Sequence, residues 1–374
     1  MAYKRLTIRI GLWSFCLLTF LPIIILIVYK TNINTLHDFR SMNINFLTLS
    51  LVFLCLSWCF DVFRLKVLTE INSTKLSFVY GVKAILSCTF LANITPSSMG
   101  GGPLLVYMLN QKGVTYGRAT AIVFIRGAVT VLFFAIGGII IVRFNKDLLS
   151  NTGIKVLYDY TVVILAAIMI FFFCLYFAPF PTRKYTNSLF NYLETLSVLR
   201  GRTSRLKKGL FHVIDDFNSS IKGFILGSNW RLILVVFYTA MINAFQFLAA
   251  PLILKGLGLD TKIMETFVIQ WVLNFMLYCV PTPGGSGIAE GLGYALFSPL
   301  VPSHIIGIFL LLWKFVTTYV WILIGGLIVV HSIGMKRLED IIMNNADVQQ
   351  RKLYEVPEQK VFEQECKHAG HQCS

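Results

Sequence analysis

Long apolar runs separated by short polar segments dominate this chain. Six of them approach or exceed the length of about 20 residues that a helix needs to cross a bilayer core. They are Ile10–Val28, Phe46–Phe60, Ala119–Val142, Val162–Phe177, Leu232–Leu254 and Ile305–Val330. Two shorter runs, Phe78–Thr95 and Phe267–Val280, end in clusters of proline and glycine. The pattern predicts a polytopic α-helical membrane protein.

Composition agrees with this prediction and excludes other classes of protein. Apolar residues make up 56% of the chain and charged residues only 14%, whereas soluble domains carry about 25% charged residues. The net charge of +15 is explained by basic cytoplasmic loops, and we expect no nucleic acid partner. Six of the eight cysteines lie in apolar segments, so no disulfide framework is expected.

The distribution of basic residues constrains the topology. Lys4, Arg5 and Arg9 near the N-terminus and the basic loop 181–229 should both face the cytoplasm, but simple counting of crossings places them on opposite sides. The conflict disappears if residues 78–111 form a re-entrant hairpin that enters from the cytoplasm and returns there. A second hairpin over residues 264–300 must then enter from outside.

An internal repeat supports this arrangement. The matched positions are Pro96 and Pro283, Gly100 and Gly287, and Tyr107 and Tyr294 at a separation of 187 residues, and Arg126 and Lys314, and Gly137-Gly138 and Gly325-Gly326 at a separation of 188. We therefore predict an all-α fold of six spanning helices plus two re-entrant broken hairpins in two inverted-topology repeats, over residues 1–143 and 144–335. Inverted repeats with discontinuous helices are typical of transporters.

The polar segments suggest two further features. Within the basic loop, apolar residues at helical spacing predict an amphipathic helix attracted by anionic lipids of the inner leaflet, although a solvated helical loop explains the spacing equally well. Residues 336–374 should form a polar cytoplasmic tail. Its residues Cys366, His368, His371 and Cys373 do not match a common zinc spacing, so we expect no metal and no cofactor.

The two Pro/Gly clusters, Thr95–Pro103 and Pro281–Glu290, are the first candidates for chemistry. Proline and glycine together break a helix, and broken backbone at membrane depth is tolerated where it is buried in protein or lines a wet cavity. The half-helix after each cluster would present free N–H groups to an anion such as a lipid phosphate. A tight helix crossing that uses glycine for close packing is the structural alternative.

Three ionisable residues lie inside apolar segments and are the second candidates. Buried charge in a membrane costs about 3 kcal/mol or more and usually marks a pathway or an ion pair. Arg126 and Lys314 would balance a phosphate, and Glu290 either pairs with one of them or meets an amine or a proton. The substrate-binding candidates are thus Gly100, Gly101, Gly102, Pro103, Tyr107, Arg126, Pro283, Gly284, Gly285, Gly287, Glu290 and Lys314.

Other polar residues are weaker candidates. Asn93, Gln246 and Asn274 would form hydrogen bonds between helices. Asp61 and Arg64, three residues apart near the end of an apolar run, are expected to form an interfacial pair.

Both clusters resemble the transmembrane region of the lysylphosphatidylglycerol synthase/flippase family. The second is the more specific, with Pro281-Thr-Pro-Gly-Gly-Ser-Gly, Glu290, Trp313-Lys-Phe and Tyr319, and the likeness covers roughly residues 5–335. The resemblance implies a flippase that moves aminoacylated phosphatidylglycerol between leaflets. Many relatives carry Glu and Arg where this chain has Gly101 and Leu104. The family's separate synthase domain is expected to be missing here.

These observations together predict a lipid translocase. Its partner would be an anionic or aminoacylated phospholipid such as lysyl-phosphatidylglycerol, or a polyprenyl-linked lipid. The alternatives are a phosphatidylglycerol lysyltransferase, as the family name implies, and a non-transporting membrane interaction subunit. We expect a multi-pass protein of the bacterial plasma membrane with both termini in the cytoplasm.

Overall fold

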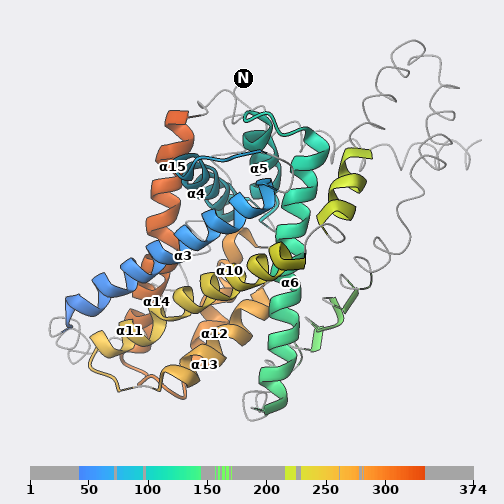
Figure 1. The fold of residues 1–374 in the computed structure, drawn as a ribbon. Coiled ribbons are helices and arrows are strands. Elements are labelled where there is room, and N and C mark those ends of the chain that lie inside the picture. The colour runs from blue at the N-terminus through green and yellow to red at the C-terminus, as the bar shows by residue number, and fades with distance from the viewer. Residues whose placement is uncertain are drawn as a thin grey trace, which may run out of the picture.

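The computed structural model describes residues 42–70, 74–95, 98–144, 215–224, 229–260, 262–277 and 282–332, together with isolated residues between 156 and 170 and Val280. Every regular element in these ranges is helical (Figure 1). The predicted span Ile10–Val28, most of the span Val162–Phe177, the amphipathic helix of the basic loop and the tail lie outside the described residues.

Four long apolar helical segments organise the described part of the chain. Each is long and apolar enough to cross a membrane. They are Ile44–Glu70, Tyr116–Gly138, Trp230–Gly256 and Ile306–His331. These segments match four of the six predicted spans, so the description of the chain as a multi-pass α-helical membrane protein is confirmed.

The same segments are divided into named elements. They are α3 (Ile44–Glu70), α6 (Tyr116–Phe144), α10 (Asn229–Phe247), α11 (Ala249–Gly256), α14 (Ile306–Lys314), the π-helical turn η5 (Phe315–Tyr319) and α15 (Val320–Ser332). α3 packs along α10 and α11, so a helix from each predicted repeat meets at this contact. At 1.5 Å per residue, α3 is about 40 Å long, which exceeds the bilayer core of about 30 Å.

Two pairs of shorter helices flank the Pro/Gly clusters. The first pair is α4 (Phe78–Ile94) and α5 (Gly101–Asn110), and the second is α12 (Ile263–Leu277) and α13 (Ile288–Phe297), which is preceded by the 3₁₀ turn η4 (Pro283–Gly285). α5 and α13 each have ten residues, about 15 Å of helix, so neither crosses a bilayer. The two pairs lie toward opposite ends of the described helices (Figure 1).

Paired glycines allow each half to pack closely against the other. A Cβ atom at Gly325, in α15, would collide with the backbone oxygen of Leu86 in α4. A Cβ atom at Gly137, in α6, would collide with the indole ring of Trp271 in α12. Each Gly-Gly step thus packs on the first hairpin helix of the other predicted repeat.

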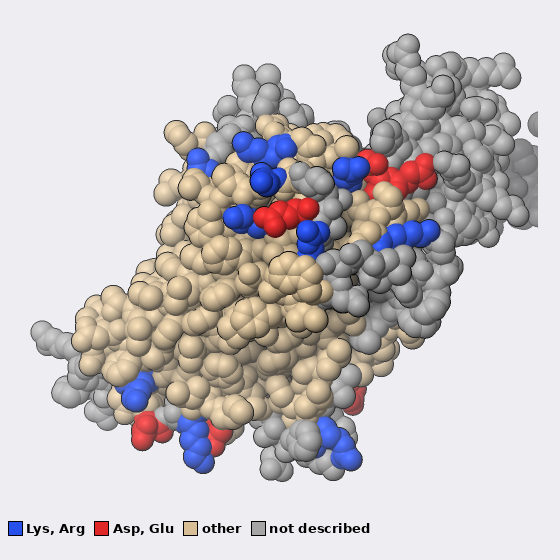
Figure 2. Space-filling view, viewed as in Figure 1, with Lys and Arg blue, Asp and Glu red and all other residues tan. Residues whose placement is uncertain are grey.

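The visible surface has a broad uncharged belt between two charged ends (Figure 2). Exposed basic residues near α4 and α5 include Lys75, Lys83, Lys112 and Arg118. At the other end, Lys255, Asp260, Lys262 and Glu265 are exposed around α11 and α12. This distribution is what a bilayer-spanning protein requires, because charges avoid the hydrocarbon region.

Candidate functional site

The break in the second hairpin is built from glycines with left-handed backbone conformations. Gly284, Gly285 and Gly287 have φ values of 57°, 69° and 83°. Glycine adopts such angles without steric cost, and a residue with a Cβ does not. The chain therefore turns sharply between α12 and α13, and α13 starts directly after Gly287.

Glu290, a residue of α13 itself, caps the N-terminus of this helix. Its side chain is fully buried, and its Oε2 accepts a hydrogen bond of 2.6 Å from the backbone N–H of Gly287. Its Oε1 lies 3.4 Å from the Nζ of Lys314, whose side chain is also buried. Of the alternatives left open by the sequence, the structure shows the pair with Lys314. The carboxylate also occupies the helix terminus where the sequence predicted a phosphate.

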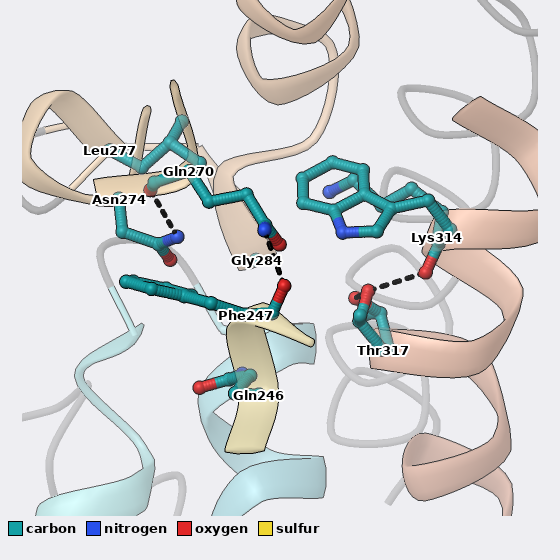
Figure 3. Close-up of a pocket in the computed structure, with 10 residues that line it drawn as sticks. Gln246, Phe247, Gln270, Asn274, Leu277, Gly284, Lys314 and Thr317 are labelled. Carbon is teal, nitrogen blue, oxygen red and sulfur yellow. Dashed lines mark hydrogen bonds between the residues drawn. The ribbon is translucent and has the colours of Figure 1, made fainter. Parts of the chain in front are cut away.

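A cavity of about 120 Å³ lies beside this break. Its wall combines side chains of α10 and α12 with η4, α14 and the π turn η5. The lining residues are Gln246, Phe247, Gln270, Asn274, Leu277, Gly284, Trp313, Lys314, Thr317 and Thr318. In the close-up, Gln246, Gln270 and Asn274 lie on one side, and Lys314 and Thr317 lie on the other (Figure 3).

Hydrogen bonds fix the orientation of two amides in the wall. The Nε2 of Gln270 donates to the backbone oxygens of Phe247, at 2.6 Å, and of Thr266, at 3.2 Å. The Nδ2 of Asn274 donates to the backbone oxygen of Gln270 at 2.7 Å. Reversing either amide would place two acceptor oxygens against each other, so the assignment follows from the chemistry of the partners. Neither amide oxygen accepts a hydrogen bond within the described ranges.

Lys314 and Trp313, two residues with donor groups, stand on the other side of the wall. One donor is the ammonium group of Lys314. The other is the Nε1 of Trp313, which is buried and has no hydrogen-bond partner among the described residues. A buried donor without a partner costs free energy comparable to a lost hydrogen bond, so it is unusual in a folded protein. The wall therefore offers amide oxygens on one side and the ammonium of Lys314 on the other, whereas the buried Nε1 of Trp313 does not reach its surface.

A π turn shapes the last part of the wall. Five residues, Phe315–Tyr319, follow Lys314 in π-helical conformation, and Thr317 and Thr318 among them line the cavity. The indole Nε1 of Trp321 donates to the backbone oxygen of Val316 at 2.9 Å, so a carbonyl in the widened turn is satisfied by a side chain. Single π turns inside α-helices occur often at functional sites.

Arg126 has an ionic partner that the sequence did not suggest. Its guanidinium donates to Oδ2 of Asp61 in α3, whose Oδ1 lies 2.6 Å from the NH2 atom of Arg64. Arg64 also donates to the hydroxyls of Thr130, at 3.0 Å, and Thr239, at 3.1 Å. Asp61 and Arg64 form the expected pair, and both are only 5% exposed, so the pair is buried within the protein. α3 continues to Glu70, well beyond the end of the apolar run. Both residues therefore lie within the helix and not at its end.

The candidates of the first cluster lie around the start of α5 and away from the cavity. The backbone N–H of Gly100 donates to Oγ1 of Thr95 at 2.9 Å, so this half-helix also begins with an internal acceptor. A Cβ atom at Gly101 would stand 2.9 Å from the backbone oxygen of Cys88, which explains a glycine at this position. Gly102 and Pro103 belong to the first turn of α5, and Tyr107 accepts a hydrogen bond from Gln111 at 2.9 Å.

The structure therefore brings together only some of the predicted site residues. Gly284 and Lys314 line the cavity. Glu290 does not line it but forms an ion pair with Lys314. The weaker candidates Gln246 and Asn274 also line it, whereas Asn93 donates to the backbone oxygen of Thr89 within α4. Sequence reasoning missed Gln270, Trp313 and the two threonines. A polar spacing of four residues in α12, between Gln270 and Asn274, was the available signal.

Comparison with known proteins identifies the family. Residues 11–325 match the family described as the lysylphosphatidylglycerol synthase TM region. The chain is also similar to a UPF0104 membrane protein of Archaeoglobus fulgidus, with 23% identity over 282 residues that cover 74% of this chain and 83% of the relative. The family match spans most of the chain and includes both Pro/Gly clusters and all three ionisable candidates. The chain therefore belongs to the family of the lysylphosphatidylglycerol synthase transmembrane region.

Proposed function

We propose that the protein is a lipid translocase that passes the head group of an anionic or aminoacylated phospholipid, or of a polyprenyl-linked lipid, between leaflets. The observation that supports it is the polar cavity beside the broken second hairpin, with Lys314 in its wall. Non-helical backbone and a buried charge at membrane depth are costly unless they serve a polar passage. Family membership supports the same function, because the resemblance to this family implies movement of a lipid between leaflets.

Alternating access between two inverted halves is the proposed mechanism. Reciprocal packing of the Gly-Gly steps, and hairpins toward opposite ends of the described helices, support a pseudo-twofold relation between the halves. The other elements of this proposal are six spans, cytoplasmic termini in a bacterial plasma membrane, and anionic inner-leaflet lipids bound at the basic loop 181–229. The candidate residues Arg126, Lys314 and Glu290, and the glycines of both clusters, belong to the same proposal.

The topology makes a prediction that labelling tests. A cysteine introduced at Lys112 should react with an impermeant maleimide only from the cytoplasmic side, and a cysteine at Pro299 only from the outside. Lys112 is exposed just beyond α5, and Pro299 follows α13, so both sites are accessible. A background without the eight native cysteines gives the matched control. Labelling of the Lys112 site from outside would make the first hairpin a full crossing.

Reconstitution separates a translocase from a lysyltransferase. Purified protein in liposomes should move a tail-labelled anionic phospholipid across the bilayer much faster than protein-free liposomes do. With lysyl-tRNA and phosphatidylglycerol the same protein should form no lysyl lipid. Formation of that product would replace the translocase by the enzyme. Failure of every lipid to cross would favour an interaction subunit.

A further inference from the structure

The cavity beside the second hairpin has hydrogen-bond acceptors on one side and a donor on the other. This arrangement limits which lipid head groups it can bind. The oxygens of Gln270 and Asn274 are acceptors, because their amide nitrogens are held by backbone carbonyls at 2.6 and 2.7 Å. Gln246, in the same wall, makes no side-chain hydrogen bond within the described part of the chain. Lys314 supplies the donor on the opposite side.

A cationic group fits this wall poorly. An ammonium placed among the amide oxygens would share the small cavity with the ammonium of Lys314, and like charges at such range repel. Glu290, the carboxylate nearest to Lys314 in the described ranges, does not line the cavity. Its two oxygens face the N–H of Gly287 and the Nζ of Lys314, so it is not available to neutralise an incoming amine.

A bare phosphate fits only half of the wall. Its oxygens would accept hydrogen bonds from Lys314, but they would also face the amide oxygens, which only accept. A hydroxyl group differs, because it donates one hydrogen bond and accepts others. Hydroxyls on adjacent carbons would donate to the oxygens of Gln270 and Asn274 while they accept from the ammonium of Lys314 opposite.

We propose that this cavity binds a hydroxyl-rich, uncharged part of a lipid head group, such as a glycerol or a sugar ring, and selects against an aminoacyl group. The inference rests on the proposed translocase and narrows its substrate class. The cavity, of about 120 Å³, holds several water-sized groups and so has room for part of such a head group. The phosphate that joins such a group to the lipid would lie toward Lys314.

The test compares lipids that share one labelled tail and differ only in head group. The full-length protein is reconstituted with phosphatidylglycerol, a glucosyl diacylglycerol, phosphatidic acid or lysyl-phosphatidylglycerol. We expect the first two to cross about tenfold faster than the last two. A head group that leaves one buried hydrogen-bonding group of the cavity unpaired should lose about that factor. The first pair distinguishes glycerol from sugar. Equal rates for phosphatidylglycerol and phosphatidic acid, or for phosphatidylglycerol and its lysyl derivative, would overturn the inference but leave the translocase standing.

A substitution in the wall should change the preference. Gln246→Glu adds a carboxylate to the cavity at nearly constant shape, and it should raise the rate for lysyl-phosphatidylglycerol relative to phosphatidylglycerol by about tenfold. Asn45→Asp adds the same charge at an exposed position in the first turn of α3 and should leave the ratio unchanged. An unchanged ratio in a monodisperse Gln246→Glu protein would contradict the assignment of the cavity.

Retention of lipids gives a readout that does not depend on movement. Native mass spectrometry of the detergent-purified protein should show phosphatidylglycerol or the glucosyl lipid bound in preference to phosphatidic acid, and Asn274→Leu, which removes one of the two acceptor oxygens, should reduce this preference. If no lipid crosses the bilayer but the retained lipids show the preference, the head-group site stands and the translocase falls. If the retained lipids show no preference, the head-group site falls.

Discussion

Asp61→Asn should destabilise the protein by about 3–5 kcal/mol, the usual cost of removing one member of a buried ionic cluster. Asp61 is 5% exposed and meets two guanidinium groups, those of Arg64 and Arg126. Asparagine keeps the shape of the side chain but leaves both cations without this carboxylate. Denaturant-induced unfolding in detergent micelles, followed by tryptophan fluorescence, measures the loss.

Arg126→Met is the matched control for this prediction. It removes one of the two cations, and the pair of Asp61 and Arg64 keeps its opposite charges matched. The side chain of Arg126 is 22% exposed, whereas that of Asp61 is 7% exposed, so the loss of the Arg126 charge is screened better by solvent. We therefore expect Arg126→Met to cost clearly less stability than Asp61→Asn. If Arg126→Met were the more destabilising of the two, Asp61 would not be the centre of the cluster.

The second large effect concerns the pair of Glu290 and Lys314. Lys314→Met leaves a fully buried carboxylate without its cation, and Glu290→Gln leaves a buried ammonium without its anion. Each single change should lower stability by about 3–5 kcal/mol. The double variant Glu290→Gln, Lys314→Met removes both charges, and the glutamine oxygen still accepts from the N–H of Gly287. Its unfolding free energy should return close to that of the parent protein.

Transport should not return with stability in that double variant. Lys314 lines the cavity, whereas Glu290 lies behind it, so removal of the ammonium takes away a donor that the head group needs. Lipid movement in liposomes, normalised to the amount of inserted protein, gives the second measurement. A double variant that recovers both stability and transport would show that the pair is structural only.

The sequence predicted the elements whose signal is local. Apolar runs located the four described spans, because burial of backbone in lipid demands about 20 apolar residues in succession. The Pro/Gly clusters located the breaks between α4 and α5 and between α12 and α13, because proline and glycine end helices through their own backbone. The family resemblance was confirmed by the match over residues 11–325.

Contacts between distant segments could not be predicted in this way. Asp61 and Arg126 are 65 residues apart, and nothing in either apolar run indicates that α3 and α6 place them in contact. The sequence also suggested free N–H groups at the starts of α5 and α13. Whether a side chain such as Thr95 or Glu290 reaches back to those groups depends on the path of the chain through the break.

The π turn is one structural difference between the two halves. Arg126 and Gly137 are eleven residues apart, and so are Lys314 and Gly325. α6 covers its interval as uninterrupted α-helix, whereas the second interval contains η5. Because a π turn holds about one extra residue, roughly 100° of rotation is lost over the same number of residues. Lys314 and Arg126 therefore project in different directions relative to their Gly-Gly steps, and the two cations face different partners, Glu290 and Asp61.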